Sequence, residues 1–255
     1  MSFSGLIGSG HCTLSDVYDV PVPVETKTYT PVSNRDLLEM TQTTMQRVYD
    51  VPAEEIDISV SLGAKGQEMF GALTVASDAT TDEKFNSSLM VVLRNSYGKS
   101  LSVAFAQGGN CWTCSNKMIS GDIVMLRKHT RNVHEDLRGI IEGIVRGALG
   151  EFRRSMGILE GLQGIPVSLD DCYRMVGLAL GYGILRSQQA SVVYDELRNP
   201  SHEEFSEMNA YSLYNHFTEA LKRSPAGDAM QRHRRATKFF GRQFGPQSLP
   251  APQLN

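Results

Sequence analysis

The sequence predicts an α+β fold, in which an antiparallel β-meander of about five strands packs against a long helix and further C-terminal helices. Segments of alternating apolar and polar residues follow one another through short connections between residues 56 and 127. A long apolar stripe with helical period begins near Asn132, and more helical patterns follow it. Consecutive strands joined by short connections pair antiparallel, and strands grouped before helices are typical of the α+β class.

The composition is that of a folded protein with an ordinary core. Of the 255 residues, 41% are hydrophobic and 21% are charged, which excludes an intrinsically disordered chain. The N-terminus lacks the basic and apolar regions of a secretory signal, and no apolar run reaches the roughly 18 residues of a membrane span. Four cysteines are too few for a disulfide scaffold. We therefore expect a cytoplasmic protein with reduced thiols and no membrane partner.

Charge is distributed unevenly along the chain, whose formal net charge is −3. Residues 1–60 carry nine acids and three bases, a net of −6, whereas residues 221–243 carry seven bases and only Asp228, a net of +6. The pattern divides the chain into three regions. We expect an extended N-terminal arm over 1–32, where prolines exclude a helix, a single α+β core domain over 33–225, and a basic helix with a flexible tail over 226–255.

The elements of the core domain follow in order. Ser33 and Asp36 form a capping pattern for a first helix. A long helix begins near Asn132, and its Gly139, Gly143 and Gly147, which recur every fourth residue, predict close packing on a sheet or a neighbour. The remaining segments alternate with period two, form a short buried run, or repeat with helical period. They predict strands over 56–62, 69–75, 88–93, 101–106 and 122–127, and helices over 168–188, 203–223 and 228–240.

Gly98-Lys99-Ser100 has the letters of a phosphate-binding loop but not its context. The first glycine of that motif is missing, because Leu93 stands at its position, and a strand rather than a helix follows. A hairpin turn is the better interpretation.

Cys111 and Cys114 have the spacing of a zinc knuckle or a redox pair. A structural zinc site needs two further ligands that the spacing does not specify, and the βαβ context of a redox pair is missing. Buried or half-buried thiols are the favoured interpretation, with the metal and redox sites as alternatives. We expect no cofactor and no metal.

The C-terminal arm gives the most suggestive pattern, in which basic and aromatic residues alternate. Arginines bind phosphates and aromatic rings stack on bases. A second basic group precedes the long helix, whose N-terminus also favours anions. The expected nucleic-acid contacts are Arg127, Lys128 and Arg131 from the second group, Arg232, Arg234, Arg235 and Lys238 from the arm, and Phe239, Phe240 or Trp112 as stacking rings. The alternative is a solvated face or a tail that docks on the acidic arm of a neighbouring subunit.

Several short segments together resemble a family of phage- and plasmid-related proteins, the domain of unknown function 932. The matching segments are RNSYGKS, CSNKM and RKHTRNVHEDL, with weaker similarity in YTPVSNRDLLE and NAYSLYNHFTEALKR, so the resemblance covers roughly residues 27 to 240. Cys111 is not part of the pattern, which argues further against a metal clamp. The residues that match the family pattern are Asn95, Ser96, Ser100, Cys114, Ser115, Asn116, His129 and Asn132.

The resemblance implies a protein of a mobile element, and the layout of the chain is also similar to that of the phage single-strand annealing recombinases. We therefore expect a non-enzymatic protein that binds single-stranded DNA as a homo-oligomer in recombination, repair or replication. Asn95, Ser96, Ser115 and Asn116 are expected to shape turns rather than contact the ligand. One alternative is an antagonist of a host defence system that binds a protein or a small nucleotide. Another is an enzyme of unknown chemistry with a site around Asn95, Cys114, Asn116 and His129.

Overall fold

The α+β class is confirmed by the computed structural model, which describes residues 12–27, 29–98, 102–111, 117–119, 124–125 and 133–245. One antiparallel sheet has the strand order β1-β2-β4-β5-β6, while the short strands β3 and β7 pair with β4 and β5. The strands are β1 (Ile56–Gly63), β2 (Glu68–Val75), β3 (Thr81–Asp82), β4 (Ser87–Ser96), β5 (Ala104–Cys111), β6 (Lys117–Ile119) and β7 (Val124–Met125). The helices are α1 (Leu14–Tyr18), α2 (Asn34–Tyr49), α3 (Val133–Gln163), α4 (Leu169–Gly181), α5 (Ser187–Arg198), α6 (Ala210–Leu221) and α7 (Ala226–Phe244).

Several boundaries differ from the sequence-based expectation, and three of them concern helices. The expected extended arm contains α1, which the reciprocal hydrogen bonds of Thr13 and Asp16 cap. The expected helix over 168–188 is broken at Gly183, whose φ of +64° suits glycine and ends the run, so that α4 and α5 are separate helices. The expected helix over 203–223 begins only at Ala210, as α6. The Asn209 side chain caps it there by accepting a hydrogen bond from the backbone N–H of Ser212.

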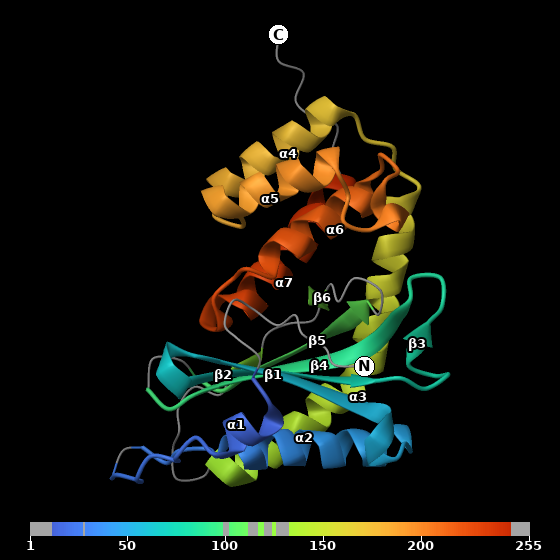
Figure 1. The fold of residues 1–255 in the computed structure, drawn as a ribbon. Helices are drawn as coiled ribbons and strands as arrows, with labels where there is room; N and C mark the ends of the chain where they lie inside the picture. The colour runs from blue at the N-terminus through green and yellow to red at the C-terminus, as the bar shows by residue number, and fades with distance from the viewer. Residues whose placement is uncertain are drawn as a thin grey trace.

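The first face of the sheet packs against α2 and α3 (Figure 1). Because side chains alternate along a strand, Leu73, Leu93 and Phe105 share this face, and all three are fully buried. Gly71 lets α2 approach closely, since a Cβ at that position would lie 3.0 Å from Cδ2 of Leu38. This face carries the main core, where burying each large apolar side chain contributes about 1.5–3 kcal/mol.

The opposite face of the sheet is covered by α7 (Figure 1). Ala229 and Met230 of α7 form a second, smaller cluster with apolar residues of β2, β4, β5 and β6. Farther along, α7 packs against α6, where Thr237 shares a hydrogen bond of 2.9 Å with the Tyr214 hydroxyl. The basic helix is therefore part of the packed core, although the expected division of the chain placed it after a boundary at residue 225. None of the helices within the described residues is long and apolar enough to cross a membrane.

Candidate nucleic-acid interface

The exposed face of α7 carries a row of cations. Residues three or four apart on a helix lie on the same side, and this spacing places Arg234, Arg235, Lys238 and Arg242 in one stripe, here called the α7 basic stripe. Arg235, Lys238 and Arg242 are exposed and Arg234 is half-buried. The only acid in α7 is Asp228, which stands outside the stripe in the first turn of the helix.

The other face of α7 holds the stripe in place through apolar packing. Ala236 and Phe240 are fully buried, and Phe239 is 5% exposed. The Phe240 ring makes edge contacts with Phe217 and Tyr214, at centroid distances of 5.0 and 5.2 Å. The expectation that Phe239 and Phe240 stack on bases is therefore wrong, because the core already covers both rings. The packing of Phe239 and Phe240 instead orients α7 so that its cations face outward.

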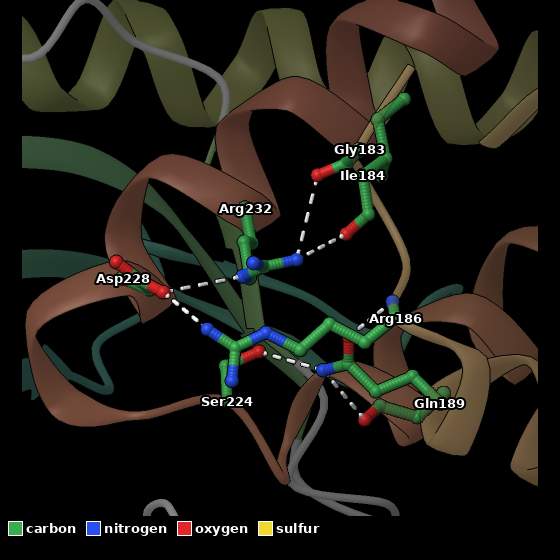
Figure 2. Close-up of polar contacts among 8 residues, drawn as sticks. Gly183, Ile184, Arg186, Gln189, Ser224, Asp228 and Arg232 are labelled. Carbon is green, nitrogen blue, oxygen red and sulfur yellow. Dashed lines mark hydrogen bonds and ion pairs between the residues drawn. The ribbon is translucent and has the colours of Figure 1, made fainter. Parts of the chain in front are cut away.

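Arg232 does not belong to the exposed stripe. Its side chain is 15% exposed, and Nη1 donates to the backbone carbonyls of Ile184 at 3.0 Å and Gly183 at 3.4 Å (Figure 2). Burial lowers the pKa of this guanidinium, and the neighbouring charges of Arg186 and Arg235 act in the same direction, whereas Asp228 opposes them. Arg232 therefore joins α7 to the connection between α4 and α5, and the expected direct contact with nucleic acid is not available to its Nη1.

The connection between α4 and α5 adds two residues that sequence reasoning missed. Arg186 is about half exposed, and its Nη2 donates to the Asp228 carboxylate at 2.8 Å (Figure 2). Tyr182 is 62% exposed, and its ring meets Phe239 edge to face at a centroid distance of 6.0 Å. An exposed aromatic ring on the same helix pair as a row of cations is a combination that binds unpaired bases together with their phosphates. The helix break at Gly183 was the signal that could have revealed both residues.

Asn95 and Ser96, which lie in one of the segments behind the predicted family resemblance, make hydrogen bonds within the chain. Asn95 is fully buried at the end of β4, and its Nδ2 donates to the Val32 carbonyl and to Oδ1 of Asn34, both at 2.8 Å. The backbone N–H of Ser96 donates to Oδ1 of Asn95 at 2.9 Å. The Asn95 side chain thus joins the sheet to the segment that leads into α2, as expected of a residue that shapes the backbone.

The other sequence-based site residues lie outside the described residues. They are Ser100, Trp112, Cys114, Ser115, Asn116, Arg127, Lys128, His129, Arg131 and Asn132. The same holds for the Cys111 side chain, although its backbone ends β5. The expected contribution of Arg127, Lys128 and Arg131 to a shared anion-binding surface therefore stays a prediction.

Comparisons with known proteins do not decide the function. No family model, no curated protein and no solved structure matches this chain. The resemblance to the phage- and plasmid-related family and the similarity to annealing recombinases stay predictions.

One other feature of the described residues, a cavity, is a weaker candidate. A cavity of about 550 Å³ lies between α3 and the β2–β4 connection, but its floor residues Phe152 and Met156 are buried, and Lys84 and Glu160 at its rim are paired with each other at 2.8 Å. Within the described ranges, no three His, Cys, Asp or Glu side chains are grouped to hold a metal ion. The face formed by α7 and Tyr182 therefore has the stronger recognition chemistry.

Proposed function

We propose that the chain binds single-stranded DNA through the α7 basic stripe and acts as a non-enzymatic homo-oligomer. The observation that carries the proposal is the row of four cations on one face of α7, with no carboxylate among them, together with an exposed tyrosine whose ring contacts Phe239 of the same helix. Cations in a row match the repeating charge of a phosphate backbone. The aromatic ring of Tyr182 matches an unpaired base, since a base within a duplex is already stacked on its neighbours.

The proposal predicts a salt-dependent affinity without strong sequence preference. Phosphate contacts carry no sequence information, and one exposed ring stacks on any base. Each neutralised phosphate of a single strand contributes about −0.7 to the slope of log affinity against log salt concentration, so four contacts give a slope of about −3. Fluorescence anisotropy with labelled oligo(dT) at several salt concentrations measures this slope.

The direct test is the double substitution Arg234→Glu with Arg235→Glu, which replaces two positive charges of the stripe by two negative ones. We expect affinity for oligo(dT) to fall by at least about tenfold, because phosphates are then repelled along half of the stripe. The matched control is Arg153→Glu with Arg154→Glu, two adjacent exposed arginines of α3. Absence of wild-type binding at low salt, or equal losses in both variants, would contradict the proposal.

Self-association is the second part of the proposal. Its support is the exposed apolar side chains of two segments, Val22 and Val24 before α2 and Leu169, Tyr173 and Leu180 along α4. Apolar residues gathered on one helix face are typical of surfaces that another protein covers. A mass determination in solution, with and without oligo(dT), tests it, and a monomeric mass in both conditions would contradict this part.

A further inference from the structure

The Asp228 carboxylate lies between two arginine side chains from different parts of the chain. Arg186, at the start of α5, donates from Nη2 to Oδ2 of Asp228 at 2.8 Å. Arg232, one helical turn along α7 from Asp228, places its Nε 3.7 Å from the same oxygen, as Figure 2 shows. Oδ2 of Asp228 therefore accepts a hydrogen bond of normal length from Arg186, whereas Nε of Arg232 is too distant for one.

This arrangement leaves a buried donor unsatisfied. The Nε–H of Arg232 has no hydrogen-bond partner among the described residues, although the side chain is largely buried. A buried polar group without a partner costs free energy, so the free protein does not make full use of the donors at this position. An acceptor with a second oxygen directed toward Nε would satisfy it.

The charge at this position is also incompletely balanced. The guanidinium of Arg186 and the charge of Arg235 both act on Arg232, and Asp228 is the acid that opposes them. Arg186 and Asp228 are each about half exposed, so an anion from solution can reach the carboxylate position. Three arginines therefore face one carboxylate here, and this excess of positive charge favours the binding of a further anion.

We infer that the Asp228 carboxylate occupies a phosphate subsite, which it yields to a phosphodiester when a DNA strand binds along the α7 basic stripe. The inference rests on the proposed function for its natural ligand. The two non-bridging oxygens of a phosphodiester accept from Arg186 and from Nε of Arg232 at the same time, which one carboxylate oxygen does not do. Asp228 thus weakens binding by competing for the first phosphate position of the strand.

Hydrogen bonds that do not involve Asp228 hold Arg186 and Arg232 in position, so the subsite persists when the Asp228 side chain moves away. The backbone N–H of Arg186 donates to Oε1 of Gln189 at 2.9 Å, and Nε2 of Gln189 donates to Oγ of Ser224 at 2.9 Å. These bonds join the start of α5 to the turn before α7 without using Asp228 (Figure 2). The carbonyls of Gly183 and Ile184 fix Arg232 in the same way.

The test is Asp228→Asn, which keeps the shape of the side chain and removes its charge. We expect affinity for oligo(dT) to rise by about threefold to tenfold and the salt slope to steepen by about 0.7, the contribution of one added phosphate contact. The matched control is Asp195→Asn on α5, which changes the net charge equally at an exposed acid 4.0 Å from Arg198. An affinity of the Asp228→Asn variant no higher than that of the control would overturn the inference.

A second probe, inorganic phosphate, tests the subsite without DNA. Phosphate is expected to raise the melting temperature of the Asp228→Asn protein more than that of the wild type or the control, and Arg186→Gln added to Asp228→Asn is expected to remove the difference. Asp228→Ser replaces Asp228→Asn if the latter does not fold, because serine is well tolerated in the first turn of a helix. Stabilisation by phosphate without oligo(dT) binding would support the subsite and contradict the proposed function. Equal phosphate effects in all variants would overturn the subsite.

Discussion

The two helices that cover opposite faces of the sheet, α3 and α7, differ sharply in how they carry charge. Over its 31 residues α3 has four bases and five acids, a net of −1, whereas α7 has five bases and one acid over 19 residues, a net of +4. On α3 two of the arginines pair with acids of the same helix, Arg146 with Glu142 at 2.7 Å and Arg154 with Glu151 at 2.6 Å. Exposed arginines therefore do not by themselves mark a binding surface. The informative feature of α7 is that its own sequence holds five bases and a single acid, Asp228.

The two helices also differ in what their buried faces contribute. The core on the α3 side of the sheet is large and continuous, whereas the cluster under the first turns of α7 includes only two α7 residues, Ala229 and Met230. Farther along, α7 depends on the aromatic contacts of Phe240 with α6. The position of the basic stripe thus depends on a few aromatic rings. Substitution of one of these rings therefore tests how α7 is held.

The largest effect is expected from Phe240→Ala, which tests whether α7 is part of the core. Removing a fully buried phenylalanine leaves a cavity, and we expect the free energy of unfolding to fall by about 3–5 kcal/mol. The control is Phe244→Ala at the end of α7, where the half-buried ring has less to lose. Urea denaturation of the full chain measures both. If α7 were a loosely attached tail, Phe240→Ala would leave the unfolding midpoint unchanged.

A smaller effect, on binding alone, is expected from Tyr182→Ala. Loss of one stacking ring weakens single-strand binding by about 1–3 kcal/mol, while Tyr182→Phe keeps the ring and is expected to keep the affinity. Binding to duplex DNA should change little, because its bases are already stacked. Anisotropy titrations with single-stranded and duplex probes separate these outcomes. An equal loss on both probes would show that Tyr182 acts through the fold rather than through a base.

Most of the secondary structure was predictable because periodicity is a local property. Alternation over residues 56–62 gave β1, and the paired signals of Ser33 and Asp36 gave the start of α2. The error at Phe239 and Phe240 came from taking the aromatic residues together with the adjacent cations. Ala236, Phe239 and Phe240 repeat at three- and four-residue spacing, which indicates a buried helical face. Applied to α7, the same periodicity would have placed the rings inside and the cations outside.

The contacts between α7 and the α4–α5 connection were not predictable in this way. Arg186 and Asp228 are 42 residues apart, and only the packing of α5 against α6 and of α6 against α7 brings them to 2.8 Å. Tyr182 became visible as a surface residue only after the helix break at Gly183 was located. Long-range pairs such as these depend on tertiary packing, about which a short stretch of sequence carries no information.

The smallest effect is expected on the exposed face of α3, at Gly139. Of the three glycines expected to allow close packing, Gly147 lies against the sheet, since a Cβ there would be 3.4 Å from Nε2 of Gln107. A Cβ at Gly139 or Gly143 would have no heavy atom of the described chain within 4 Å. Gly139→Ala should therefore raise the free energy of unfolding by about 0.5–1 kcal/mol, because alanine lowers the entropy of the unfolded helix segment without a clash. The contrasting variant is Gly108→Ala on β5, whose Cβ would lie 1.8 Å from the Met118 carbonyl oxygen and should destabilise the sheet. A loss of stability in Gly139→Ala would show instead that this face of α3 packs closely against another surface, such as a second copy of the chain.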